Sequence, residues 1–200
     1  MGLSYMIEAN IKKPKIIAII PARGGSKRLH RKNISLIWGK PMISWVINEA
    51  KKSEYIDEVW VTTEDDEIAE IAKLSGAKIH KRPAELSKDN VYKMEAIREC
   101  FDRIKSSQDT NNHIVVSLQA NSPEIKSEIL DDAIKTFIDH DRNELISVGP
   151  NMMQNAAFRI MKDWYVFQKD LSTKTGVYMC DLIDVHTEED VKSIEARNKK

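Results

Sequence analysis

The sequence predicts an α/β fold, a three-layer αβα sandwich in which helices cover both faces of a central, mostly parallel sheet. The first observation is that strand-like and helix-like segments alternate along the chain, a pattern that right-handed crossovers accommodate well. The second is the continuous apolar run Ile16–Ile20, which is typical of a strand buried on both faces. The third is the composition, because 200 residues with 42% hydrophobic positions suffice for the core of one domain.

The first two elements follow from local chemistry. The strand over 16–20 stops at Pro21, which has no N–H group to continue a ladder. A helix is expected from Pro41, since proline suits the first turn of a helix. Apolar residues then recur at helical spacing, and Lys51 and Lys52 end the segment where the helix dipole favours positive charge.

The remaining elements continue the same alternation. Strands are predicted from β-branched and apolar runs, and helices from apolar residues at a spacing of three to four. The expected strands cover residues 58–63, 77–80, 113–119 and 145–148. The expected helices cover residues 64–75, 91–105 and 127–139.

Charge and cysteine content exclude several classes of protein. The 31 basic residues balance the 31 acidic ones, so no net field attracts nucleic acid or a membrane surface. No apolar run reaches the length of a membrane span, and the first residues lack the apolar core of a signal peptide, so a cytoplasmic protein is expected. Cys100 and Cys180 stand far apart without a metal-binding motif, and both are expected to be buried thiols.

Two stretches depart from the alternation. Residues 1–14 show no clear period and are expected to form a flexible leader before a single domain over 15–200. Residues 151–174 mix polar residues with methionines and aromatics, including Trp164, Tyr165 and Phe167. This segment is interpreted either as an antiparallel excursion or as an arm that covers a partner, and the aromatic residues as core or as an interface patch.

The loop after the first strand carries the clearest chemical signal. It reads Pro21-Ala22-Arg23-Gly24-Gly25-Ser26-Lys27-Arg28 and is followed by Arg31-Lys32-Asn33. Glycine amides approach phosphate oxygens closely, and the surrounding cations and hydroxyl would complete a phosphate cradle. The pattern matches neither the Walker loop nor the dinucleotide fingerprint. A tight turn with a solvated basic surface explains the same residues, and the loop alone does not separate the two interpretations.

The loop and its flanks resemble the acylneuraminate (CMP-sialic acid) cytidylyltransferase family. The similar stretches include Ile19–Lys27 with Lys32-Asn33, Leu36–Ile43, Val61–Asp65 and Lys81–Asp89. They follow one another in order across most of residues 15–140. The resemblance implies a Rossmann-like domain of the nucleotide-diphospho-sugar transferase type, and transfer of CMP from CTP to an acidic sugar with release of pyrophosphate.

The resemblance also implies a set of nucleotide-binding residues. Arg23 and Lys27 would be catalytic, because their cations stabilise the triphosphate and the charge that develops on pyrophosphate. Gln119 has a donor and an acceptor for a cytosine edge, although residues 119–122 would also make an ordinary turn before Pro123. The nucleotide-binding residues expected from the motifs are Ala22, Arg23, Gly24, Gly25, Ser26, Lys32, Asn33, Arg82, Gln119, Asn121 and Ser122.

A metal site is implied near the C-terminal end. Residues 183–191 resemble the family's Asp-x-Asp-Thr motif, with Asp184 in place and His186 where the second carboxylate would stand. On an extended strand the two side chains would share one face and reach one ion. Mg²⁺ prefers oxygen ligands, so His186 either binds a softer ion such as Mn²⁺ or contacts phosphate as a cation. Thr187 and Asp190 instead form a helix N-cap pattern.

The acceptor site is the least determined part. Lys174–Tyr178 resembles the family's acceptor segment, and Gln168, Lys169 and Lys174 are the candidates for binding an acceptor carboxylate or phosphate. The resemblance further implies a homodimer that acts on CTP and an acidic sugar such as a nonulosonic acid. Two alternatives stay open: the same chemistry on a KDO-like acid, a sugar phosphate or a phosphonate, and a non-catalytic nucleotide-binding relative.

Overall fold

The computed structural model describes residues 13–107, 112–170 and 172–197. A seven-stranded sheet forms its centre, in the order β5-β4-β1-β6-β8-β7-β9. Its strands are β1 (Lys15–Pro21), β4 (Glu58–Thr63), β5 (Lys78–Lys81), β6 (His113–Leu118), β7 (Glu144–Val148), β8 (Gln154–Lys162) and β9 (Thr175–Met179). The short strands β2 (Leu36–Ile37) and β3 (Lys40–Pro41) pair separately.

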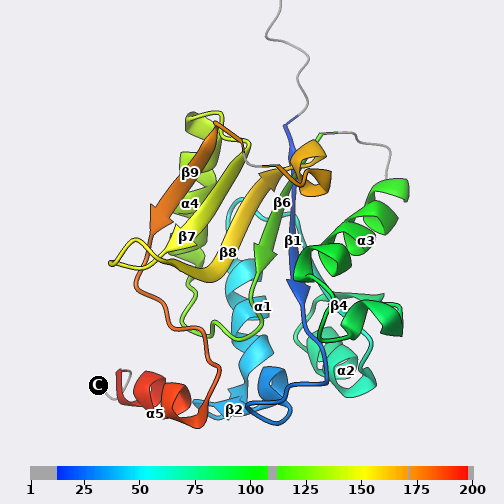
Figure 1. Cartoon of the computed structure of the whole chain (residues 1–200), viewed down its shortest axis with the longest axis vertical. Coiled ribbons are helices and arrows are strands. Elements are labelled where there is room, and N and C mark those ends of the chain that lie inside the picture. Colours follow the sequence, from blue (N-terminus) through cyan, green and yellow to red (C-terminus); the bar gives the residue numbers. More distant parts are fainter. Residues whose placement is uncertain (1–12, 108–111, 171, 198–200) are drawn as a thin grey trace, which may run out of the picture.

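Helices cover this sheet and connect its strands (Figure 1). The α-helices are α1 (Met42–Lys52), α2 (Asp66–Leu74), α3 (Lys93–Ser106), α4 (Ser127–Asp139) and α5 (Glu188–Arg197). Short 3-10 helices are η2 (Lys32–Ile34), η3 (Ala84–Ser87) and η4 (Trp164–Phe167). Each helix and strand expected between residues 16 and 148 is present, with ends that differ by at most two residues. Pro41 caps α1 rather than occupying its first turn.

The sheet is parallel except at one strand. β1 pairs in parallel with β4 and β6, whereas β8 runs antiparallel to both β6 and β7. Residues 154–162 are therefore the antiparallel excursion, and the alternative of an arm is wrong for them, because β8 is paired on both sides inside the sheet. Because β8 is antiparallel, it ends at the end of the sheet where β6 begins, and Lys162 pairs there with Ile114.

β1 shows how the sequence pattern builds the three layers. Ile16, Ala18 and Ile20 pack with α1, α2 and α4 on one face. Ile17 and Ile19 pack with α3 and η4 on the other. Strands buried on both faces read as continuous apolar runs, which is why this segment shows no polar alternation. The mostly parallel αβα sandwich expected from the sequence is confirmed.

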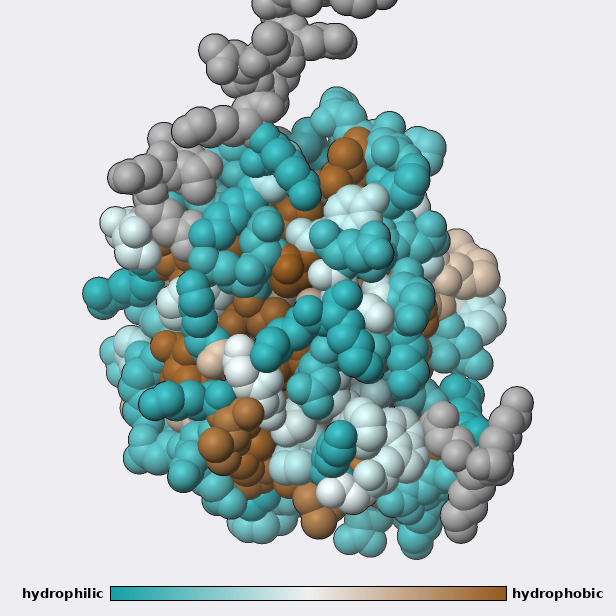
Figure 2. All heavy atoms as spheres, turned by 180° about the vertical axis from the view of Figure 1, so that it is seen from behind, coloured by the Kyte–Doolittle hydropathy of each residue, from teal (hydrophilic) through white to brown (hydrophobic). Residues whose placement is uncertain are grey.

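The outer surface differs from this interior. Figure 2 views the molecule from behind, the side on which α1 and α4 lie behind the sheet in Figure 1. Hydrophilic atoms cover most of it, and hydrophobic atoms appear in patches between them. Within the described residues, no helix is both long and apolar enough to cross a membrane. Cys100 and Cys180 are buried free thiols, as expected. The proposed leader falls almost entirely outside the described residues.

Glu58 provides a test of how charge stabilises this fold. Its carboxylate accepts hydrogen bonds from Lys15 at 2.6 Å and from the Trp60 indole at 2.8 Å, and it pairs with Lys78 at 3.0 Å. Burial opposes ionisation of the carboxyl group, but these partners outweigh burial and lower the pKa of Glu58 to about 2. Because the pKa of Glu58 is lower in the folded protein than in the unfolded chain, its ionisation stabilises the fold at pH values above the unfolded pKa. This stabilisation is lost as the pH falls toward 2.

We therefore expect Glu58→Gln to reduce the free energy of unfolding by ~1–2 kcal/mol at neutral pH. The difference from the wild type should shrink as the pH falls below 4.5, the ordinary pKa of the group. Urea unfolding between pH 7 and pH 3 measures both, with the exposed Glu54→Gln as control. If the difference in unfolding free energy between the wild type and Glu58→Gln did not change with pH, the lowered pKa of Glu58 would be contradicted.

Candidate active site

The main cavity lies where the parallel strands end. It has a volume of about 490 Å³ and is lined by residues that follow β1, β5 and β6. The chain runs from β1 outward to β4 and β5 and then returns to β6 on the other side of β1, so the direction of the strand order reverses between β1 and β6. Ligands of open α/β sheets bind at such a switch point, outside the carboxyl ends of the strands. The topology thus forms a cavity next to the glycine loop.

Interactions from two directions hold the glycine loop. Asn33 is buried and donates from Nδ2 to the Arg23 carbonyl at 3.0 Å. On the other side the loop meets the N-cap of α2, where a Cβ atom on Gly24 would collide with the Asp65 carboxylate. Gly24 is therefore required for this close approach, whatever the loop binds. Asp65 in turn pairs with Arg31 at 2.6 Å.

Glu64 connects the loop to the next wall of the cavity. Its carboxylate accepts from the Gly24 N–H at 2.9 Å, from Arg82 Nη2 at 2.7 Å and from Ser87 Oγ at 2.6 Å. Burial favours the neutral acid, but the hydrogen bonds from Ser87, Arg82 and the Gly24 amide outweigh it and lower the pKa of Glu64. One partly buried carboxylate thus orients the loop backbone and an arginine. The Arg82 Nε is also buried and has no hydrogen-bond partner within the described residues.

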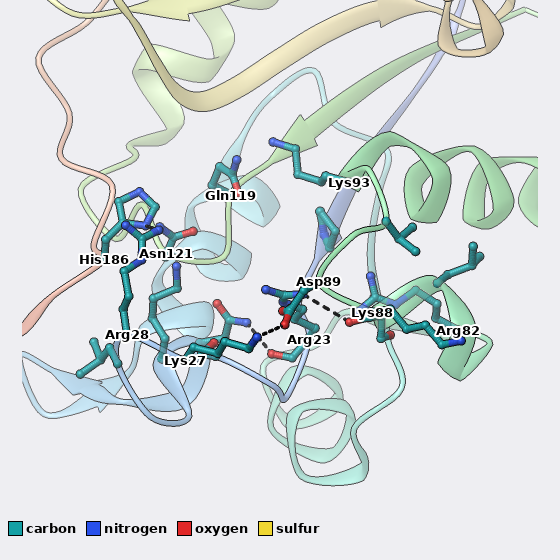
Figure 3. A pocket seen from close by; sticks show the side chains of 18 residues that line it. Arg23, Lys27, Arg28, Arg82, Lys88, Asp89, Lys93, Gln119, Asn121 and His186 are labelled. Atoms are coloured by element: carbon teal, nitrogen blue, oxygen red, sulfur yellow. Dashed lines mark hydrogen bonds and ion pairs between the residues drawn. The ribbon is translucent and has the colours of Figure 1, made fainter.

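Positive charge dominates the cavity wall. The described lining includes seven arginines and lysines but a single carboxylate, Asp89. Asp89 pairs with Arg23 at 2.8 Å and also with Lys27, and Figure 3 shows the three side chains meeting in the centre of the view. The hydrogen bond from Lys27, together with Arg23, lowers the pKa of Asp89. The seven cations are Arg23, Lys27, Arg28, Lys32, Arg82, Lys88 and Lys93.

The end of β6 and the segment after β9 form the other wall. Gln119 and Asn121 line the cavity, and the Asn121 amide donates to the Val185 carbonyl at 2.8 Å. Asp184 accepts a hydrogen bond from Ser122. Burial raises the pKa of Asp184 to about 6, against the opposing effects of the Ser122 hydrogen bond and the nearby Lys93. Asn121 and Ser122 therefore position the segment that carries Asp184.

His186 lies in a different environment from Asp184. The segment around it is irregular, which corrects the expected strand, although Val185 is fully buried. Arg28 Nη2 lies 3.3 Å from His186 Nδ1, and because a guanidinium only donates, Nδ1 is the acceptor. Burial, with the charges of Lys32 and Arg28, lowers the pKa of His186. A neutral ring beside two cations is a poor place for a metal ion.

The donor set therefore fits a metal ion only through Asp184. Within the described residues, no three His, Cys, Asp or Glu side chains come together as a metal-binding group. Mg²⁺ is commonly held by one or two carboxylates together with substrate phosphates. A single carboxylate beside a polycationic cavity fits that arrangement. The expectation that His186 shares the ion is not supported by its surroundings.

Comparison with known families gives a direct result. The family model described as cytidylyltransferase matches residues 17–186. The chain belongs to the cytidylyltransferase family. The match extends from β1 to His186 and therefore includes the glycine loop, the cationic cavity and Asp184.

Two curated relatives show what this chain is similar to within the family. The chain is 38% identical over 137 residues to N-acylneuraminate cytidylyltransferase A of Danio rerio, covering 68% of this chain and 31% of the relative. It is 37% identical over 134 residues to pseudaminic acid cytidylyltransferase of Campylobacter jejuni, covering 66% of this chain and 57% of the relative. The chain thus spans about a third to just over half of these relatives.

A solved structure supports the fold of this family member over nearly its whole length. A CMP:2-keto-3-deoxy-manno-octonic acid synthetase complexed with CTP superposes with a TM-score of 0.73 and 17% sequence identity. The match covers 92% of this chain and 98% of the other. At this identity the comparison establishes the shared fold.

The cavity brings together most of the predicted nucleotide-binding residues. Four of the predicted residues do not line the cavity but belong to the same loops as residues that do. These four are Ala22, Gly24, Gly25 and Ser122. The predicted residues that do line it are Arg23, Ser26, Lys27, Lys32, Asn33, Arg82, Gln119, Asn121 and His186.

The predicted acceptor residues are not brought to this cavity within one chain. Gln168 follows η4, and Lys174 pairs with Asp141 at 2.7 Å. The three predicted residues lie near the end of the sheet opposite the cavity. The antiparallel β8 returns the chain to that end before β9 begins, and the three are Gln168, Lys169 and Lys174. Their assignment to an acceptor site in the same chain is corrected.

Sequence reasoning missed three residues that shape the cavity, Glu64, Asp89 and Lys93. Glu64 and Asp89 lie in stretches that resemble the family, but nothing local marks them as partners of the loop. Lys93 has a signal of its own. It is the first residue of α3, where the helix dipole disfavours a cation.

Asp89 leads to a prediction about anion binding. Because it neutralises Arg23 and Lys27, a bound triphosphate must compete with it for the same cations. We expect Asp89→Asn to tighten the binding of inorganic pyrophosphate by ~3- to 10-fold, since an exposed ion pair contributes little more than that. Calorimetry at low salt measures the change. Glu85→Gln, an exposed carboxylate in η3, is the control, and weaker binding by Asp89→Asn would contradict the prediction.

Proposed function

We propose that the protein is a metal-dependent cytidylyltransferase that transfers CMP from CTP to an acidic sugar of the nonulosonic type. The observation that carries the proposal is the cationic cavity at the switch point of the sheet, with the glycine loop on one side and Gln119 on the other. The relatives named above act on N-acylneuraminate and pseudaminic acid, which are sugar acids. The same substrate class is proposed for this chain.

Different residues of the cavity would bind the triphosphate and the base in such a transfer. Arg23, Lys27 and Lys32 bind the triphosphate and neutralise the charge that leaves with pyrophosphate. Burial, followed by the charge of Arg28, lowers the pKa of Lys32, so an incoming phosphate strengthens its protonation. Gln119 presents an amide to the base. Positioning and electrostatics account for the catalysis, and no nucleophilic side chain is required.

The bonds exchanged are those of a nucleotidyl transfer. The anomeric hydroxyl oxygen of the sugar bonds to the α-phosphorus of CTP. The bond from that phosphorus to the oxygen bridging the β-phosphate breaks, its electron pair leaves with pyrophosphate, and the hydroxyl proton passes to solvent. Asp184 is the residue that would hold a divalent metal, with Mg²⁺ proposed and Mn²⁺ as the alternative. When bound, that ion supplies further neutralisation of phosphate charge.

Assembly and location are part of the same proposal. β9 is an edge strand whose Val177 and Met179 are exposed. Unpaired edges with apolar side chains favour association. A homodimer acting in the cytoplasm as one catalytic domain is proposed, and light scattering that gives a monomer at working concentrations would contradict the dimer.

The deciding experiment is a calorimetric titration with CTP, UTP, ATP and GTP, each with Mg²⁺ and again with Mn²⁺. We expect selective binding of CTP, and loss of that selectivity in Gln119→Leu. Pyrophosphate release is then assayed with N-acylneuraminate and other sugar acids. Absence of CTP selectivity would overturn the proposed function, whereas CTP binding without pyrophosphate release under any condition would favour the non-catalytic relative.

A further inference from the structure

Lys93 lies in the cavity apart from the phosphate loop. It is the first residue of α3, and Figure 3 shows its side chain reaching from that helix toward Gln119 at the end of β6. Arg23, Lys27 and Asp89 meet in a separate cluster of the same view. The charges that act most on Lys93 come from Asp184 and from Arg159 of β8. Lys93 thus lies toward the wall formed by the end of β6 and the segment after β9.

Within the described residues the Lys93 ammonium has no ionic partner, as is also the case for Arg28, Lys32 and Lys88 in the cavity lining. Arg23 and Lys27 share Asp89, and Arg82 pairs with Glu64 at 2.7 Å. Arg159 is already paired with Glu144. Within the described residues Lys93 makes no hydrogen bond or salt bridge. Burial lowers its pKa, an effect that the charge of Asp184 only partly opposes. A partly desolvated ammonium group without a counterion is costly, so an anion that reached it would be bound favourably.

The position of Lys93 also argues against a purely structural role. A lysine at the first position of a fourteen-residue helix faces the positive end of the dipole. Tyr92 caps α3 without a side-chain hydrogen bond, so the first turn presents its own N–H groups as well. Both features raise the positive potential at this point. Neither stabilises the apo protein, and both favour a negatively charged ligand.

We propose that Lys93 binds the carboxylate of the acceptor sugar, beside the site of CMP transfer. This inference rests on the proposed function. A sugar acid brings its carboxylate close to a triphosphate, and the two anions repel one another across a few ångströms. The cations of the glycine loop serve the phosphates. Lys93 lies apart from that loop, has no ionic partner within the described residues, and is placed to neutralise the second anion and to orient the acceptor toward the triphosphate.

The experiment compares the wild type with Lys93→Gln and Lys93→Arg. The control is Lys105→Gln, which makes the same change near the other end of α3. CTP affinity is measured first, without acceptor. Initial rates of pyrophosphate release then give KM for N-acylneuraminate, pseudaminic acid and 2-keto-3-deoxy-manno-octonic acid. Each is also assayed as its neutral carboxamide, which keeps the shape of the acid but removes the charge.

We expect Lys93→Gln to raise KM for the best acid by ~10- to 100-fold, the loss typical of a charge-assisted hydrogen bond. In Lys93→Gln the CTP affinity should stay close to that of the wild type, and the preference for the acid over the carboxamide should disappear. Lys93→Arg should restore much of that preference. Two results would overturn the inference alone: a large loss of CTP affinity with unchanged acceptor KM, or an equal loss for acid and carboxamide. A wild type that binds CTP but uses no sugar acid would overturn the proposed function together with the inference. A wild type that does not bind CTP would overturn the proposed function itself.

Discussion

Asp184→Asn should reduce the rate of pyrophosphate release by ~100-fold or more while leaving the fold intact. The substitution keeps the size of the side chain and an oxygen to accept the Ser122 hydrogen bond, but it removes the negative charge. A divalent cation would then lose the carboxylate that would hold it beside the cavity, and the phosphates would lose the charge neutralisation which that ion would supply. The measurement is kcat at saturating CTP, with Mg²⁺ titrated over a wide range.

Asp181→Asn is the matched control for this prediction. Asp181 lies three residues earlier, is exposed, and makes only a 3.5 Å contact with Arg197. It should retain the activity and the metal dependence of the wild type. If Asp184→Asn kept the same kcat and the same dependence on Mg²⁺, Asp184 could not be the ligand. Removal of divalent metal with a chelator should abolish turnover in both the wild type and the control.

The second large effect is expected for stability at the buried pair Arg82–Glu64. Arg82 has a side chain that is only 5% exposed, and its Nη2 lies 2.7 Å from the Glu64 carboxylate. Arg82→Met leaves that carboxylate partly buried without its cation. Removing one member of a buried pair typically costs ~3–5 kcal/mol, because the remaining charge loses its compensation. Denaturant unfolding should show a loss of this order, together with weaker CTP binding.

The double variant Arg82→Met/Glu64→Gln separates charge from packing. The introduced glutamine side chain keeps one oxygen to accept from the Gly24 N–H, and its NH₂ group can donate to the Ser87 hydroxyl oxygen, but it carries no charge to leave uncompensated. We expect the double variant to be more stable than Arg82→Met alone. If the losses in unfolding free energy of the two substitutions were instead additive, the loss in Arg82→Met would come from lost packing rather than from the unpaired Glu64 carboxylate.

Most of the fold could be predicted because its cause is local. The continuous apolar run of β1 requires cover on both faces, and the alternation of strands and helices favours a mostly parallel sheet. The same chemistry placed the glycine loop at the end of β1 and the cavity at the edge where parallel strands end. For residues 151–174 periodicity left two alternatives open, and pairing in the sheet decided between them.

By itself, the sequence determined the order of the elements, the loop from Pro21 to Asn33 and the presence of Asp184, because these depend on residue types and spacing within short segments. The tertiary structure alone decided which distant residues meet. It joined Glu64 and Asp89 to the loop, placed His186 against Arg28, and placed Lys174 at the end of the sheet opposite the cavity. The physical reason is that such contacts depend on strand order and direction, and local hydrophobic periodicity carries no information about which strand lies next to which.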